Sequence, residues 1–223
     1  MTRIDSRFQT CAVVLALFAV LTASSACSSS EAPSAAQTSW AELTLAVVPN
    51  MVTYKSIDEQ VSRAALVVDG TFEGLSPGET IVETEGGVED MRRSAVAKIR
   101  VKKALVGDSR ETHVYLQVQI GASQTYEEYE AAFPTAERVI VALAPAPLVA
   151  DTPGAKVEDP GAGAPGGATI YTALPQGLFY SDGAESFVAP LGGSDSGADD
   201  GPRIRISSME DAERLYTEAG TGN

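Results

Sequence analysis

Two neighbouring stretches decide the fold: Ala-Val-Ala-Lys-Ile-Arg-Val-Lys-Lys-Ala-Leu-Val at residues 95–106 and His-Val-Tyr-Leu-Gln-Val-Gln-Ile at residues 113–120. In both stretches apolar and polar side chains alternate, and a period of two is typical of a β-strand that buries one face. We therefore expect these two strands to form the centre of a mainly β (α+β) fold.

The rest of the chain shows further strand and helix signals around this pair. Apolar runs predict strands at 65–72, with a bulge at Asp69-Gly70, and at 138–144. Later in the chain we expect a strand at 169–174, a hairpin at 177–188 that turns at Asp182-Gly183, and a short strand at 203–206. Capping residues predict helices that follow Ser56, Thr125 and Ser208 and run to about residues 63, 133 and 219. Segments 145–168 and 192–201 are poor in large side chains, so we expect long mobile loops there.

The first 26 residues have the composition of a secretion signal. Arg3 and Arg7 precede an apolar stretch at 11–21, which is shorter than the roughly 20 residues that a membrane-spanning helix needs. Cys27 follows a run of small residues, and this arrangement resembles a bacterial lipoprotein signal, in which the cysteine carries palmitate-type acyl chains. The chain departs from that pattern at Ser24, where the family usually has leucine. The alternative is an ordinary secreted protein that is cleaved after a small residue such as Ala23 or Ala26.

These signals predict three parts: a signal peptide at 1–26, a flexible tether at 27–39 and one folded domain at 40–223. The lipoprotein interpretation places that domain on the extracytoplasmic face of the cell membrane, anchored through Cys27. Cys11 would leave with the signal, so an acylated Cys27 would leave the mature chain with neither a free thiol nor a disulfide.

Charge and composition exclude several classes of function. The 223 residues contain 16 Lys and Arg against 30 Asp and Glu, a net charge of −14, which argues against a nucleic-acid partner. One His and two Cys exclude most His or thiolate metal sites, and we expect no cofactor and no metal. Loop carboxylates are the only Ca²⁺ candidates, and they do not match the EF-hand spacing from Asp195. They are Asp151, Glu158, Asp159, Asp195, Asp199 and Asp200.

The expected order of elements, three strands, a short helix and then further strands, is that of an OB-like five-stranded barrel with a helix between strands 3 and 4. The capped N-terminal helix and the C-terminal helix would be additions to this barrel. The order is carried by four motifs: Ala-Ala-Leu-Val-Val-Asp-Gly-Thr-Phe at 64–72, the strand from 97 that ends in Lys-Ala-Leu-Val-Gly-Asp at 103–108, Arg-Val-Ile-Val-Ala-Leu at 138–143, and Gln-Gly-Leu-Phe at 176–179.

With these motifs the chain resembles a loosely defined group of bacterial, especially actinobacterial, lipoproteins of unknown function that have an OB-like or netrin-like barrel. The resemblance covers most of residues 55–190. It departs before the fourth strand, where Ala136-Glu137 replaces the glycine that is usual in the group. Netrin-like inhibitors need a free N-terminal Cys fixed by a disulfide, which an acylated Cys27 does not supply, so the resemblance implies a fold and no function.

One stretch of the chain concentrates positive charge. The candidate binding residues are Arg92, Arg93, Lys98, Arg100, Lys102 and Tyr115, with Lys103 and Gln117 beside them. Lys98, Arg100 and Lys102 would project from one side of a strand, where an anionic polymer or an acidic envelope protein could bind. The same alternation marks an ordinary solvated strand face that discourages edge pairing, and this second interpretation is the one we prefer.

The sequence contains no recognisable catalytic motif. Our first hypothesis is therefore a membrane-anchored lipoprotein of the cell envelope that acts as a non-catalytic binding or interaction module. One alternative is an envelope hydrolase that uses a pair of Asp or Glu residues. Another is an accessory subunit of an envelope complex. A hydrolase would need a cleft with carboxylates of raised pKa, and an accessory subunit would need a broad exposed apolar patch.

Overall fold

The computed structural model describes residues 39–45, 54–85, 88–146, 155–181, 187–188 and 206–222. The predicted signal peptide, Cys27, most of the tether, the loop at 192–201 and residues 203–205 of the last predicted strand lie outside these ranges. The helices are α1 (Trp40–Leu45), α2 (Ile57–Val61), α3 (Tyr126–Ala132) and α4 (Met209–Thr221). The strands are β1 (Leu66–Glu85), β2 (Val88–Val106), β3 (His113–Ile120), β4 (Arg138–Pro145), β5 (Ala155–Glu158), β6 (Ile170–Ser181) and β7 (Phe187–Val188).

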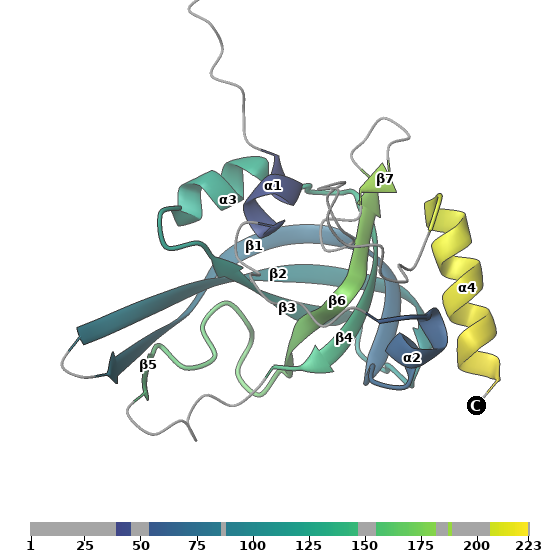
Figure 1. The fold of residues 1–223 in the computed structure, drawn as a ribbon, viewed down its shortest axis with the longest axis horizontal. Helices are drawn as coiled ribbons and strands as arrows, with labels where there is room; N and C mark the ends of the chain where they lie inside the picture. The colour runs from purple at the N-terminus through teal and green to yellow at the C-terminus, as the bar shows by residue number, and fades with distance from the viewer. Residues whose placement is uncertain are drawn as a thin grey trace, which may run out of the picture. The chain divides into compact units, whose positions relative to one another are not determined.

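The described strands form one mixed sheet whose hydrogen bonds close into a ring (Figure 1). Around the ring, β1 pairs with β2, β2 with β3, β3 with β6, β6 with β4, and β4 with β1. The β3–β6 pairing is parallel and the others are antiparallel. β5 adds to the edge of β1 and β7 to β6. The expectation of a mainly β fold with helices is therefore confirmed.

β1 and β2 are much longer than the sequence predicts. Their pairing continues to Glu85 and Val88, well beyond the predicted strand ends, and forms a hairpin arm that extends past the ring (Figure 1). The register of β1 shifts at several places, one of them at Asp69/Gly70, where the sequence predicts a bulge. A further shift lies between Phe72 and Gly74, so Glu73 is an extra residue with no partner on β2.

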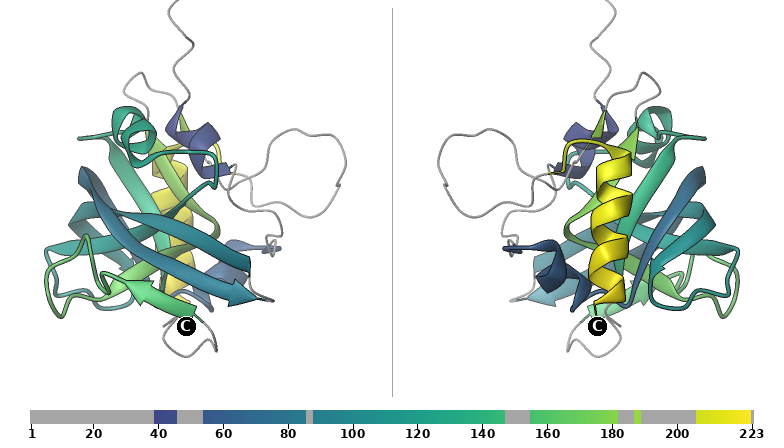
Figure 2. Two further views of the ribbon diagram at one scale, coloured as in Figure 1. Left: turned by 90° about the vertical axis from the view of Figure 1, so that its left-hand side faces the viewer. Right: turned by 90° about the vertical axis from the view of Figure 1, so that its right-hand side faces the viewer.

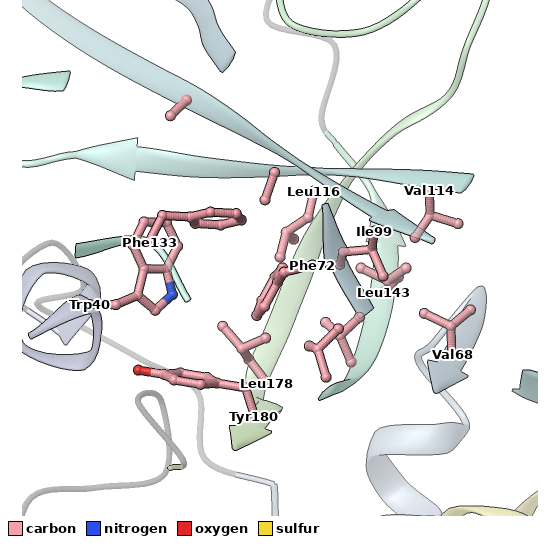
Figure 3. Packing of buried hydrophobic residues seen from close by; sticks show 14 of the residues in the cluster. Trp40, Val68, Phe72, Ile99, Val114, Leu116, Phe133, Leu143, Leu178 and Tyr180 are labelled. Atoms are coloured by element: carbon pink, nitrogen blue, oxygen red, sulfur yellow. The ribbon is translucent and has the colours of Figure 1, made fainter. Parts of the chain in front are cut away.

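The inside of the ring is one apolar core, to which every strand of the ring contributes (Figure 3). Phe72 packs edge-to-face against Phe133, with ring centroids 5.0 Å apart, and Phe133 packs in the same way against Trp40 at 5.1 Å. Tyr129 of α3 contacts Trp40 from another side, with ring centroids 5.5 Å apart. Tyr129 and the C-cap residue Phe133, four positions apart, thus give α3 a core-facing side.

Helix α1 was not predicted. Its first turn has the capping pattern that the sequence contains at Ser39 and Glu42: Ser39 N–H donates to Glu42 Oε2 at 2.7 Å, and Glu42 N–H donates to Ser39 Oγ at 3.3 Å. The hydrogen bond from the Ser39 backbone lowers the pKa of the Glu42 carboxyl. Trp40 follows directly and is 2% exposed, so this short helix inserts its first side chain into the core.

A second apolar cluster lies outside the ring, beneath α2 and α4, and α4 runs along the outer side of the strands in Figure 2. Tyr216 of α4 and Gln60 of α2 are both completely buried, and the Tyr216 hydroxyl donates to Gln60 Oε1. Gln60 Nε2 in turn donates to the Pro175 carbonyl at 2.6 Å. Burial raises the pKa of Tyr216, which keeps the phenol neutral and able to donate.

Part of the segment 145–168, where a long mobile loop is expected, has regular structure. Residues 155–158 form β5, and the turns that follow pack back onto the sheet. A Cβ on Gly163 would lie 2.7 Å from Val96 Cβ, and its φ of +84° is in the left-handed region. Val96 points outward from β2 and is nevertheless 1% exposed, because the segment around Gly163 covers it. The absence of a side chain at Gly163 allows this close approach to the sheet.

Two further boundaries differ from the prediction. The expected strands at 169–174 and from 177 form a single strand, β6, whose register against β4 shifts between Val141 and Leu143 so that extra residues loop outward. The predicted hairpin is present as the β6–β7 pair, in which Tyr180 faces Val188, although its turn lies outside the described residues. α4 does not end at Gly220 and continues to Thr221, with Gly222 as its C-cap.

Candidate binding face on the second strand

The outward-facing side chains of β2 form the candidate site. Alternation along the strand turns Ala95, Ala97 and Ile99 into the core, where each is fully buried. Lys98 and Arg100 therefore point away from the core, and their side chains are 43% and 62% exposed. The predicted placement of these cations on one outer face is what the strand period requires.

Lys98, Arg100 and His113 converge on one carboxylate, that of Glu73. Lys98 Nζ is 3.0 Å and His113 Nε2 is 3.1 Å from Glu73 Oε2, while Arg100 Nε is 3.3 Å from Glu73 Oε1. The bulge at Glu73 makes this possible, because the extra residue in β1 presents its side chain to the outer face between two β2 partners. The hydrogen bond from Lys98, assisted by the other two groups, lowers the pKa of Glu73.

Lys102 belongs to a different cluster, centred on Asp69 and Arg138. Asp69 is 1% exposed and accepts hydrogen bonds from Arg138 Nε and Nη2, both at 3.0 Å. Lys102 Nζ is 3.8 Å from Asp69 Oδ2. Arg138 also reaches Glu213 of α4 at 2.6 Å, and Lys103 Nζ lies 3.3 Å from the same carboxylate. This cluster joins β1, β2 and β4 to α4.

Arg92 and Arg93 belong to neither cluster, because each has a partner elsewhere on the sheet or beside α3. Arg92 lies on the hairpin arm and pairs with Glu83 of β1. Arg93 points to the opposite side of the strand, where its Nη2 donates to the Gln124 carbonyl at 2.9 Å near the start of α3. The six predicted candidates therefore do not form a single site, and Arg92 and Arg93 hold local structure.

Tyr115 and Gln117 lie on β3 beside this face. Tyr115 is the register partner of Lys98, and Gln117 is the partner of Val96. Gln117 Nε2 donates to Glu79 Oε1 at 3.2 Å, next to the segment around Gly163 that covers Val96. The exposed part of the candidate face is thus bounded on one side by this covering segment.

Neither His113 nor Glu73 was among the residues predicted from the sequence to bind a ligand. The structure gives His113 two partners: Nδ1 is 3.0 Å from Thr112 Oγ1, and Nε2 contacts Glu73. Nothing in the sequence marks Glu73, because its position follows from a register shift in β1. His113 could have been connected to Arg100 from the sequence, since the two residues face each other once β2 and β3 are paired.

The pKa shifts of the described carboxyl groups share one direction. Where the pKa of a described carboxyl departs from its usual value it is lowered, as in Glu42, Glu73, Asp211 and Glu213, because hydrogen bonds stabilise the charged form. Within the described ranges no three His, Cys, Asp or Glu side chains are grouped closely enough to hold a metal ion. Of the Ca²⁺ candidates, Glu158 pairs with Lys156 and Asp159 has a left-handed φ of +52°. Asp151, Asp195, Asp199 and Asp200 lie outside the described residues.

Two hollows on the described surface lie away from the Glu73 cluster. One of about 620 Å³ separates α2 from α4 and is lined by Ile57, Asp58, Ser62, Leu215, Glu218, Ala219 and Gly222. Another, of about 290 Å³, lies beside the β2–β3 connection and is lined by residues that include Asp108, Arg110 and Tyr171. The candidate binding face itself is a strand surface on which Lys98 and Arg100 are exposed.

No protein-family model matches the chain, and it matches neither a curated protein nor a solved structure. Among the helices of the described segments, none has the length and apolar character needed to cross a lipid bilayer.

Proposed function

We propose that the protein is a lipid-anchored envelope protein whose domain is a non-catalytic binding module with an OB-like barrel fold. In this proposal acylated Cys27 holds the domain at the extracytoplasmic face of the cell membrane. The ligand or partner meets the outer face of β2, around Lys98 and Arg100. The observation that carries this proposal is that three side chains, Lys98, Arg100 and His113, contact the single carboxylate of Glu73.

The strand order supports the OB-like part of the proposal. If β6 is counted as the fifth strand of the ring, the order is 1-2-3-5-4 with closure onto strand 1 and a parallel pair between strands 3 and 5. Helix α3 lies between the third and fourth strands and packs across one end of the core through Tyr129. A helix between the third and fourth strands is also typical of an OB-type barrel, so this order supports the proposal, in which β5, β7, α1, α2 and α4 are additions.

The charge distribution supports binding at the outer face of β2. The protein has a net charge of −14, yet at this point Lys98 and Arg100 share a single carboxylate. A local excess of positive charge on an acidic protein attracts an anionic group once that group is within a Debye length, about 10 Å at 0.1 M salt.

The described carboxylates favour this function over a hydrolase. A general acid needs a carboxyl whose pKa is raised toward neutrality. Hydrogen bonds lower the pKa of Glu73 and of Glu213, the carboxylates at the centres of the two charged clusters.

The accessory-subunit alternative needs an exposed apolar patch. Among the described residues, Met91 is the one large apolar side chain with high exposure, at 55%.

The lipid anchor is tested by metabolic labelling of cells with an alkyne analogue of palmitate, followed by membrane fractionation. Wild type should take up label and sediment with membranes, and Cys27→Ala should do neither. Cys11→Ala is the matched control, because in this proposal Cys11 leaves with the signal. Loss of label in Cys11→Ala with retention in Cys27→Ala would refute the proposed anchor.

The binding function is tested by chemical crosslinking on intact cells that express the full-length protein, with mass spectrometry of whatever is captured. A dominant envelope component, polymer or protein, that is recovered with wild type supports a binding module. If wild type captures no more than an unrelated lipoprotein does, the proposed binding function is wrong.

A further inference from the structure

We propose that Glu73 is an internal occupant of an anion site formed by Lys98, Arg100 and His113, and that the natural occupant is a phosphate group of a phosphate-bearing polymer. This inference rests on the proposed function and names the ligand class for the same face. It assigns Glu73 the role of a competitor that limits affinity.

The geometry around Glu73 is that of a bound two-oxygen anion. One oxygen, Oε2, lies 3.0 Å from Lys98 Nζ and 3.1 Å from His113 Nε2, and the other, Oε1, lies 3.3 Å from Arg100 Nε. The two non-bridging oxygens of a phosphodiester present a similar fork to the same donors, and both groups favour charge-assisted hydrogen bonds with Arg and Lys. The site thus holds a carboxylate where an external phosphate group would fit.

The donors are held by the sheet and need little rearrangement. Lys98 and Arg100 are alternate residues of β2, and His113 is the register partner of Arg100 on β3. Glu73 enters this group from β1 at a bulge, without a β2 partner of its own. Rotation of the Glu73 side chain would therefore open the site and leave the three donors on their strands.

The extended strand favours a polymer over a single small anion. An exposed ion pair contributes little free energy, so one phosphate at this surface would bind weakly. Lys98 and Arg100 are two residues apart on the outer face of β2, a step of roughly 6.7 Å along the strand, and Lys102 lies beyond them beside Asp69. A chain that carries a phosphate on each repeat can engage several of these cations together, which multiplies weak contacts.

The experiment measures binding of inorganic polyphosphate to the processed full-length protein at about 0.1 M salt, where repulsion from distant carboxylates is screened. We expect Glu73→Gln to bind about 3- to 10-fold more tightly than wild type, because it removes the competing charge, and Lys98→Gln with Arg100→Gln to bind at least about 10-fold more weakly. Thermal unfolding of each variant establishes that it is folded.

Glu83→Gln is the matched control for Glu73→Gln. It removes one negative charge from the same strand and frees a cation, Arg92, outside the Glu73 cluster. If Glu83→Gln strengthens binding as much as Glu73→Gln, only net charge matters and the inference is overturned. Arg92→Gln serves in the same way for the double variant and should leave the affinity nearly unchanged.

Two other results would also overturn the inference. One is an affinity of poly-L-glutamate that equals or exceeds that of polyphosphate, since the ligand class would then be wrong. The other is the absence of polyphosphate binding to both wild type and Glu73→Gln. Intact-cell crosslinking distinguishes failure of this inference from failure of the proposed function. A partner that is captured equally by wild type and by the Lys98/Arg100 double variant would show that the protein is a binding module but that it does not bind through this face.

Discussion

Arg138 holds the carboxylate of Asp69 with two parallel hydrogen bonds of 3.0 Å, and this pair lies between the ring and α4. Asp69 is 1% exposed, so its charge has little contact with water. Arg138 extends the contact to Glu210 and Glu213 on the first turns of α4. A buried charge that is satisfied in this way stabilises the attachment of α4, and its partner cannot be removed without cost.

We therefore expect Arg138→Met to lower the free energy of unfolding by about 2–4 kcal/mol, since it leaves Asp69 buried with only Lys102, 3.8 Å away, to balance its charge. The double variant Asp69→Leu/Arg138→Met should lose much less, because no buried charge remains. Urea denaturation of both variants measures this. A double variant that is at least as unstable as the single one would show that Asp69 is not the reason.

The acid sensitivity of the protein should depend on Glu213. Hydrogen bonds from Arg138 and then from Lys103 lower the pKa of this carboxyl below its usual value of 4.5. A folded-state pKa that lies below the unfolded one stabilises the fold at pH values above the unfolded pKa, and this stabilisation is lost as the pH falls through the folded pKa.

In unfolding experiments from pH 7 to pH 3, Glu213→Gln should therefore be less stable than wild type at pH 7, and the difference should shrink below about pH 4.5. Glu218→Gln, on the same helix and paired only with Arg214 among the described residues, is the control. A gap between wild type and Glu213→Gln that stays constant with pH would contradict the expectation.

Ala136 adopts a left-handed backbone conformation, with a φ of +69°, directly before Glu137 and β4. Ala136 N–H donates to the Phe72 carbonyl at 2.8 Å. Ala136→Gly should raise the free energy of unfolding by about 0.5–1 kcal/mol, because the left-handed penalty exceeds the extra entropy of glycine in the unfolded chain. Ala131→Gly, in helix α3, should instead lower it by about 1 kcal/mol. Stabilities measured in urea distinguish these opposite signs.

Gly163 fits the covering segment onto β2, and a Cβ at this position would meet Val96 Cβ at 2.7 Å and the Pro77 carbonyl at 2.9 Å. We expect Gly163→Ala to displace the segment and to speed hydrogen exchange at 159–168, with a loss of about 1–3 kcal/mol in stability. Gly161→Ala is the matched control, because Gly161 has a similar φ of +76° and a Cβ there would meet no atom within 4 Å. Equal exchange rates in the two variants would argue against contact with Val96.

The sequence predicted much of the local structure. The period of two at 113–120 predicts the bounds of β3, and the Thr125/Glu128 capping box predicts where α3 begins, because both signals depend on residues a few positions apart. The same signal at Ser39 and Glu42 would have located α1, although its position over the core depends on Trp40 finding Tyr129 and Phe133.

The candidate site was predicted only in part, since a strand pattern says which side chains share a face and not what lies opposite them. Lys98 and Arg100 were placed correctly on the outer face of β2. The carboxylates that they and Lys102 contact, Glu73 and Asp69, come from β1, and the register between these strands follows from several bulges that no short-range pattern specifies.

By itself, then, the sequence determined the mainly β character, the capped helices and the outward direction of the basic side chains, because alternation and capping are local properties of the chain. Only the tertiary structure decided that β3 meets β6 in parallel and closes the ring, that β5 joins β1, and that Glu73 receives Lys98, Arg100 and His113. These contacts join residues far apart in the chain, and their formation depends on how one common core is packed.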